Sequence, residues 1–236
     1  MSVTFIRHYT TGSRQRSVKA LPPQKNDLLK AIATLKSSTP KRNFKQSIEL
    51  IMKLKDMDMK KPESRIETSV EVPHQIPKDV KICVIASGDL ALRAKKGGAD
   101  RVLARAELEV IVKDKKAAKK FAAEFNHFIA EAPLMPLIGK SLGTFLGPRG
   151  KMPTPIPPNA PVEEIIARHR RTVKLRIRDQ PAVKCRVATE DMADDEIADN
   201  LLAVISGVES KLAKGDKNVA NIILKATMGK PVKVGA

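Results

Sequence analysis

The most chemically suggestive run in the sequence is Gly139-Lys140-Ser141, which has the ending of a phosphate-binding loop. That motif requires a glycine five residues before Gly139, and position 134 is Leu134. The run also follows residues with helical spacing, whereas the motif follows a strand. We therefore reject a nucleotide-phosphate loop. Gly88 follows an apolar run, but the G-x-G-x-x-G pattern of dinucleotide-binding folds is absent.

Metal-binding and catalytic residue types are few and scattered. The cysteines are Cys83 and Cys185, and the histidines are His8, His74, His127 and His169. They form no zinc-ligand spacing, so the cysteines are expected to be buried, reduced thiols. No serine, histidine and acid, and no pair of carboxylates, stands in a catalytic setting. The sequence therefore predicts no metal, no cofactor and no enzymatic activity.

Positive charge is the chemistry that the sequence supplies in quantity, with a formal net charge of +18. Nucleic acid is the favoured partner, because a basic surface releases the counterions condensed on phosphates. An anionic membrane surface and a basic surface without a partner are the alternatives. Aromatic residues make up only 3% of the chain, too few for a platform that stacks unpaired bases. A folded RNA recognised by shape and backbone, or a DNA duplex, fits better.

Five cations gather on one predicted hairpin between residues 173 and 187, where apolar and basic residues alternate. They are Lys174, Arg176, Arg178, Lys184 and Arg186. Like charges side by side cost stability, which a phosphate partner would offset. A solvated face with counterions is the alternative.

The two ends of the chain share one pattern of elements, and the middle has another. The ends predict helices at 26–39, 161–171 and 191–214, capped at the first by Asn26 or Asp27, with strands at 46–50, 65–72, 173–178, 183–187 and 221–228. The middle predicts strands at 80–86, 102–103, 110–112 and 128–130, with helices at 90–96, 114–125 and 134–146. Strands alternating with helices indicate a small parallel α/β layer. The Gly- and Pro-rich run 147–161 indicates an ordered loop and a domain boundary.

The loop after residue 146 carries two cations, Arg149 and Lys151. Pro148 and Pro153 stiffen it, while Gly147 and Gly150 permit close approach of the backbone. Such a rigid loop could bind phosphate or fix the packing of a domain junction, and we favour packing.

No apolar run reaches the 18 or more residues of a membrane span, and residues 1–10 lack the apolar core of a secretory signal. Residues 1–26 contain no acid. Three interpretations of this segment remain open. It could be a basic arm that binds RNA phosphates, a mitochondrial transit peptide, or a tail without a function.

Three stretches resemble the ribosomal protein L1 family, the stalk proteins of the large ribosomal subunit. The longest is the signature Leu134-Met135-Pro136-Leu137-Ile138-Gly139-Lys140 through Leu146-Gly147-Pro148-Arg149-Gly150-Lys151-Met152-Pro153. Asn43-Phe44 with Ser47 and Glu49, and Thr227-Met228-Gly229, agree with it. The resemblance covers residues 27–234, and the Lys151-Met152 form looks archaeal.

The resemblance implies an α/β fold. Residues 27–74 and 159–236 would form a discontinuous RNA-binding domain of α+β type with an open-sided sheet. Residues 75–158 would form an inserted Rossmann-like, three-layer α/β domain, joined by a two-stranded hinge. Residues 1–26 would be a basic N-terminal arm outside the resemblance.

In function, the resemblance implies a structural constituent of the large subunit, monomeric on the cytoplasmic ribosome and without a membrane partner. The family's partners would be large-subunit ribosomal RNA at the stalk base and exit-site transfer RNA, whose release it assists. Many members also repress translation of their own messenger RNA. Two alternatives stay open: a nucleotide-dependent enzyme built on the middle domain, and a nucleic-acid-compacting protein indifferent to sequence.

Residue by residue, the resemblance places RNA contacts at Phe44, Ser47, Glu49, Thr227, Met228 and Gly229. The two hydroxyls would meet ribose 2′-OH groups, and the two apolar side chains would exclude water. Arg42, Arg178 and Lys230 are the accompanying cations. The family often has Ser before and Pro directly after this Thr-Met-Gly, where this chain has Ala226 and Lys230. Lys230 could add a phosphate contact.

Overall fold

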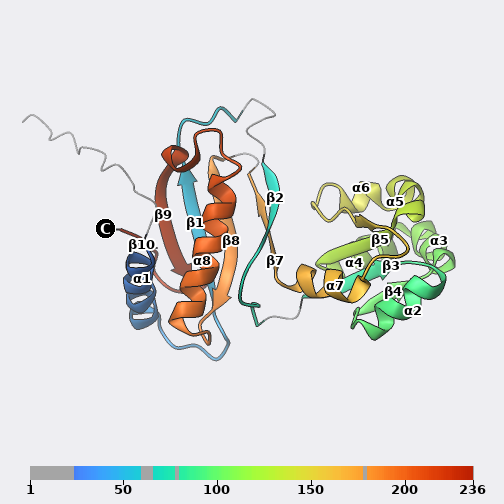
Figure 1. The fold of residues 1–236 in the computed structure, drawn as a ribbon, viewed down its shortest axis with the longest axis horizontal. Coiled ribbons are helices and arrows are strands. Elements are labelled where there is room, and N and C mark those ends of the chain that lie inside the picture. The colour runs from blue at the N-terminus through green and yellow to red at the C-terminus, as the bar shows by residue number, and fades with distance from the viewer. Residues whose placement is uncertain (1–23, 60–65, 78–79, 178–179, 236) are drawn as a thin grey trace, which may run out of the picture.

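Strands from both ends of the chain form one antiparallel sheet in the order β10-β9-β1-β8. The computed structural model describes residues 24–59, 66–77, 80–177 and 180–235. The strands are β1 (Ser47–Leu54), β8 (Ala182–Thr189), β9 (Val219–Ala226) and β10 (Val232–Lys233). Helices α1 (Lys25–Ser38) and α8 (Asp194–Glu209) cover one face (Figure 1). We call this part of the structure the outer body.

Strand β1 shows why the sheet is open on its other face. Ile48, Leu50 and Met52 are buried beneath the helices, while Ser47 and Glu49, which point the opposite way, are only half-buried. The open-sided sheet implied by the family resemblance is therefore present.

Helix α1 begins earlier than predicted. Neither Asn26 nor Asp27 caps it, because both lie inside the first turn and the cap position is Gln24, without a side-chain bond. Asp27 instead places a negative charge near the positive end of the helix dipole. The helix ends where Thr39 Oγ1 donates to Leu35 O at 2.6 Å, one residue before Pro40.

A two-stranded antiparallel ribbon, β2 (Glu67–Glu71) with β7 (Thr172–Arg176), lies against α8. Gly207 allows this approach, because a Cβ there would lie 2.5 Å from Val70 Cγ2. The predicted hairpin of β7 with β8 is wrong in its pairing: in the described residues β7 pairs with β2, and β8 with β1. Local alternation identified the strands and their buried faces but not their distant partners.

The middle segment forms a parallel sheet in the order β4-β3-β5-β6. The strands are β3 (Ile82–Ile85), β4 (Arg101–Leu103), β5 (His127–Glu131) and β6 (Thr154–Ile156). The helices are α2 (Gly88–Lys96), α3 (Arg105–Lys113), α4 (Lys115–Glu124), α5 (Met135–Ser141), α6 (Gly143–Leu146) and α7 (Val162–Arg170), with 3-10 turns at Ala132–Leu134 and, in the outer body, Gly215–Asn218. Side chains of α3 to α6 pack on one face of the sheet, and those of α2 and α7 on the other. This middle body is the predicted three-layer α/β arrangement.

Two local predictions in the middle body are wrong. Residues 110–112 belong to α3 and not to a strand, since a short apolar run does not separate the two structures. Residues 154–156 form β6, within the Gly- and Pro-rich run that was predicted to be a loop. That strand lies at the sheet edge, where a missing N–H is tolerated.

Helix α7 packs with the middle body, although a boundary after residue 158 would assign it to the outer one. Val162 and Ile166 are buried in the same cluster as Ile82 and Ile156. An amphipathic pattern shows that a helix covers a sheet but not which sheet. The chain thus returns to the outer body at Arg171, directly before β7.

Candidate nucleic-acid interface

Two segments 180 residues apart meet where β9 ends and β1 begins. Ser47 N donates to Thr227 Oγ1 at 3.1 Å, and Thr227 N donates to Ser47 O at 3.1 Å. The Thr227 hydroxyl also donates to Ser47 O at 3.3 Å. The structure therefore brings together the two stretches that the family resemblance marked as RNA contacts.

Gln46 anchors this junction, and the sequence analysis missed it. Its side chain is fully buried, with Oε1 accepting from Met228 N at 3.2 Å and Nε2 donating to Pro40 O at 2.9 Å. It thereby ties the end of α1, the start of β1 and the turn after β9. The available signal was its place two residues before Ile48, in step with the buried face of β1.

Phe44 and Met228 flank the junction and are exposed, by 48% and 59%. Residues of these types would ordinarily lie in a core. Their exposure at one junction creates apolar surface that a partner could cover.

Close packing within the protein explains why position 229 is a glycine. A Cβ there would lie 2.8 Å from Thr39 Oγ1 and 3.0 Å from Ala226 Cβ. The turn that carries Thr227 and Met228 can thus sit close against the end of α1. Gly229 N donates to Ala226 O at 3.0 Å and closes the turn.

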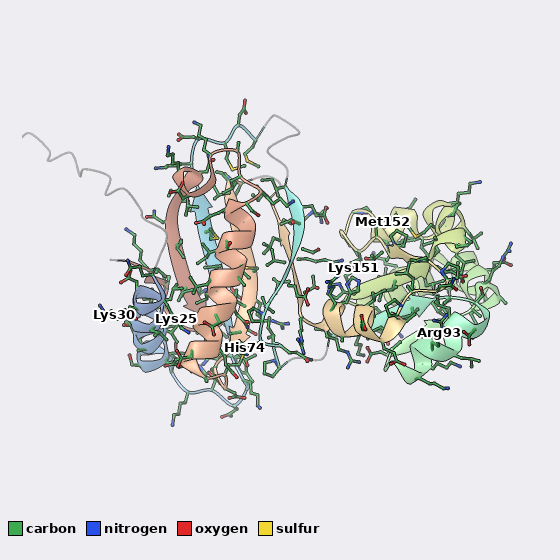
Figure 2. The ribbon with its side chains drawn as sticks, in the orientation of Figure 1. Lys25, Lys30, His74, Arg93, Lys151 and Met152 are labelled. Atoms are coloured by element: carbon green, nitrogen blue, oxygen red, sulfur yellow. The ribbon has the colours of Figure 1, made fainter. Side chains whose placement is uncertain are left out.

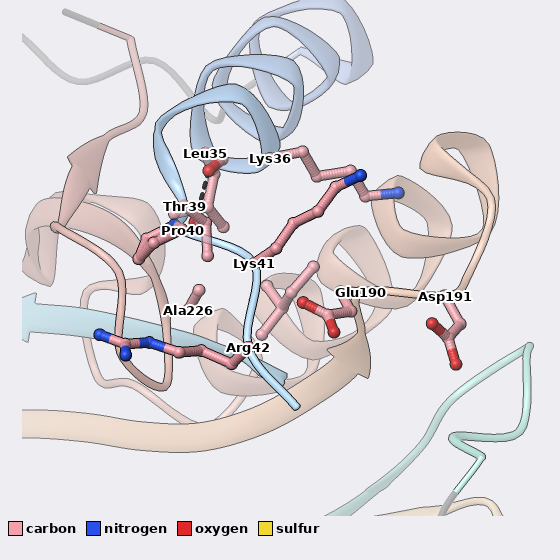
Figure 3. Close-up of a pocket in the computed structure, with 10 residues that line it drawn as sticks. Leu35, Lys36, Thr39, Pro40, Lys41, Arg42, Glu190, Asp191 and Ala226 are labelled. Atoms are coloured by element: carbon pink, nitrogen blue, oxygen red, sulfur yellow. Dashed lines mark hydrogen bonds between the residues drawn. The ribbon is translucent and has the colours of Figure 1, made fainter. Parts of the chain in front are cut away.

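A cavity of about 360 Å³ adjoins the junction (Figure 3). It is lined by Leu35, Lys36, Thr39, Pro40, Lys41, Arg42, Ile48, Glu190, Asp191 and Ala226. Asp191 Oδ2 is paired with Lys45 Nζ at 2.7 Å, and this hydrogen bond raises the pKa of Lys45.

Arg42 and Lys230 are exposed and form no ion pair within the described residues. We call Arg42, Phe44, Ser47 and Thr227 to Lys230 the junction patch.

Glu49 lies on the open face of the sheet beside the junction patch. It stands in register with Lys225 of β9 and with Arg186 of β8. A carboxylate between two cations remains a hydrogen-bond acceptor without making the surface acidic. Arg178, the remaining predicted contact, lies outside the described residues, as does the arm up to residue 23.

The signature loop, Gly147 to Pro153, is not part of the junction patch. Lys151 Nζ donates to Ala122 O at 3.0 Å and to Phe125 O at 2.6 Å, so it satisfies carbonyls at the end of α4. Burial, and then the charge of Arg149, lower the pKa of Lys151. Lys151 and Met152 lie on the side of the middle body that faces the ribbon (Figure 2). These hydrogen bonds of Lys151 support the packing role that we favoured for the signature loop.

In the middle body, a nucleotide would be expected at the carboxyl ends of β3 and β5, where the strand order reverses. Glu131 occupies that position: its Oε2 accepts from Ser87 N at 3.1 Å and from Ser87 Oγ at 2.8 Å. A carboxylate there repels phosphate.

Over the described residues, no group of three or more acids, histidines and cysteines could hold a metal ion. Each described helix is also too short or too polar to cross a membrane.

A model of the ribosomal protein L1p/L10e family matches residues 33–230, which include the junction patch and the signature loop. The chain belongs to this family. A relative from Hyperthermus butylicus is 52% identical over 196 residues, covering 83% of this chain and 90% of the relative. Relatives from Thermofilum pendens and Methanothermobacter thermautotrophicus are 49% and 45% identical, covering 85% and 88% of this chain and 88% and 98% of their own lengths. All three are named large ribosomal subunit protein uL1.

Membership of the L1p/L10e family confirms the predicted family and its archaeal character, since the similar relatives are archaeal. It also confirms that the protein is a ribosomal protein of cytoplasmic ribosomes and not an enzyme. The enzyme alternative is therefore dropped.

Proposed function

We propose that this protein is a constituent of the large ribosomal subunit and binds folded ribosomal RNA at the stalk base through the junction patch. The observation that carries the proposal is the Ser47–Thr227 junction, where hydrogen bonds to the Ser47 backbone fix the Thr227 hydroxyl on the surface. The exposed side chains of Phe44 and Met228 lie on either side of it. The net charge of +18 supplies the long-range attraction to RNA.

The hydrogen-bonding capacity of Thr227 defines what it can recognise. Its hydroxyl proton is donated to Ser47 O, and one lone pair accepts from Ser47 N. One lone pair remains, so Thr227 can accept a bond from a ribose 2′-OH, a group that RNA has and DNA lacks. Ser47 Oγ has no partner among the described residues and can donate or accept beside it.

The surroundings strengthen this recognition. Phe44 and Met228 would cover the hydroxyl contacts and exclude competing water. Arg42 and Lys230 would pair with phosphates, and Glu49 would accept from base amino groups or a further 2′-OH. These contacts favour a preformed RNA surface over a flexible single strand.

Two further roles rest on the family resemblance alone and belong to the same proposal. The protein assists release of exit-site transfer RNA, and it represses its own messenger RNA where that RNA repeats the stalk-base structure. It acts as a monomer within the ribosome.

The test is a competition binding assay with a labelled stalk-base RNA fragment, duplex DNA as competitor, and a salt titration. Specific binding predicts that the RNA complex survives excess DNA and has a shallow salt slope. If duplex DNA competes as well as the RNA itself, binding is driven by charge and is indifferent to sequence. The logarithm of the binding constant should then fall by about 0.9 per phosphate contact for each tenfold rise in salt concentration.

A further inference from the structure

A second cationic site lies between the two bodies, in a cleft of about 390 Å³. Its walls are Ile76, Val80, Asn126, His127, Arg170, Arg171, Thr172, Val173, Lys174, Lys184, Cys185 and Arg186. Strands β7 and β8 form one wall, and the start of β5 with the end of α7 forms the other. The wall thus contains five cations and no carboxylate.

These cations are not neutralised across the cleft. Arg170 donates to Gly98 O at 2.6 Å and Lys174 to Gly150 O at 3.2 Å, and both acceptors are uncharged carbonyls. The side chains of Arg171, Lys184 and Arg186 form no hydrogen bond or ion pair with any described residue. Burial lowers the pKa of Lys174, against a smaller opposing effect of Glu67, and it lowers the pKa of Arg186.

Two buried nitrogen atoms at the cleft also lack partners. Arg186 Nε and His127 Nδ1 are inaccessible to solvent and have no hydrogen-bond partner within the described parts of the chain. Buried polar atoms in folded proteins are nearly always paired, and an unpaired buried N–H group is costly. Arg171, Lys184 and Arg186 therefore offer charged donors at the cleft that have no acceptor among the described residues.

We propose that this interdomain cleft binds a phosphate group, with Arg186, Lys184 and Lys174 of the outer body and Arg171, at the point where the chain leaves the middle body, as its ligands. Phosphate supplies several charged acceptor oxygens, which match guanidinium and ammonium donors on both walls. The bound anion would offset the mutual repulsion of these four cations. An RNA phosphodiester and free inorganic phosphate share this chemistry.

The two possible sources are linked to different parts of the fold. Arg186 stands in register with Glu49 on the open face of the sheet, so an RNA strand on the junction patch could continue into the cleft. That source rests on the proposed function, whereas binding of free phosphate does not.

The experiment titrates inorganic phosphate into the full-length protein by calorimetry at constant ionic strength. The variants are Arg186→Gln and the more exposed Lys184→Gln. The control is Lys211→Gln, which removes one exposed charge outside the cleft. Each cleft variant is expected to weaken phosphate binding, by about tenfold for Arg186→Gln, the loss of one charge-assisted hydrogen-bonding group. The control should match the wild type.

A second titration uses the stalk-base RNA fragment with the same variants. If Arg186→Gln and Lys184→Gln weaken RNA as well as phosphate, the natural ligand is an RNA phosphodiester; if they weaken phosphate alone, it is a free phosphate. Absence of phosphate binding to the wild type, or equal affinity in both variants and the control, would overturn the cleft site. Thr227→Ala separates the two proposals, because it should weaken RNA binding and leave phosphate affinity unchanged.

Discussion

Gly150 and Glu67 belong to different bodies, yet a Cβ on Gly150 would lie 2.5 Å from Glu67 Oε1. The same Cβ would lie 2.9 Å from Arg176 Nη1, and Arg176 pairs with Glu67 at 3.6 Å. Lys174 Nζ donates to the carbonyl of Gly150 at 3.2 Å. The family's signature loop therefore joins the middle body to the ribbon of the outer one.

Gly150→Ala should disturb this junction. The backbone has φ of +64° there, a conformation that costs a residue with a side chain about 1 kcal/mol or more, and the new methyl group collides with an ion pair. We expect a loss of about 1–3 kcal/mol in the free energy of unfolding, measured in urea. Gly139→Ala is the matched control, because its Cβ would meet nothing within 4 Å in helix α5. Equal stability of the two variants would contradict the proposed contact.

Thr227→Ala should weaken binding of the stalk-base RNA by about 1–3 kcal/mol, as for loss of a hydrogen-bond partner in a buried contact. The substitution also removes the acceptor for Ser47 N, so a smaller loss of stability is expected. Thr227→Ser keeps the hydroxyl and should retain most of the affinity. A loss in Thr227→Ala no larger than that of Lys211→Gln would remove Thr227 from the interface.

Gln46→Met should destabilise the protein by about 2 kcal/mol in urea unfolding, since it leaves Met228 N and Pro40 O without their partner in a buried position. Methionine has a similar length, so the change is mainly one of hydrogen bonding. Gln75→Met, at an exposed position, should be nearly neutral. An equally small effect at both positions would show that Gln46 does not hold the junction.

The spacing of apolar residues in the sequence predicted the features that depend on neighbouring residues alone, namely the type of each element and the face that it buries. The stripe of α1, the alternation of β1 and the continuous apolar run of β3 each identify an element and its buried face. The pairing of β7 with β2 and the attachment of α7 to the middle body depend on contacts between distant segments. Periodicity does not encode such contacts, and these are where the predictions failed.

The candidate site divides in the same way. Composition alone pointed to nucleic acid, but only the family resemblance singled out Phe44 and Met228, which would otherwise be assigned to the core. Neither argument identified Gln46, because a glutamine at the start of a predicted strand and beside basic residues is usually exposed. Its hydrogen-bond partners are 6 and 182 residues away in the sequence. The cleft cations of β7 and β8 were recognised as a charged face, but the opposing wall came only from the fold.

Acid should destabilise the folded protein through His127. Burial, and then the charges of Lys174, His169 and Lys151, lower the pKa of His127 from 6.5 to about 3. Between these two values the unfolded chain binds a proton that the folded protein excludes. Stability from this group is therefore complete above pH 6.5 and falls as the pH drops towards 3, by at most about 1.4 kcal/mol per pH unit.

His127→Asn removes this titration while keeping a polar side chain of similar shape. Urea unfolding of both proteins between pH 4 and pH 8 isolates the contribution, because the carboxylates titrate in both. We expect the wild type to lose stability more steeply than the variant below pH 6.5, with parallel curves above it. Parallel curves over the whole range would mean that His127 has the same pKa in the folded and the unfolded protein, so its ring would add a positive charge to the cleft wall formed by β5 only in acid.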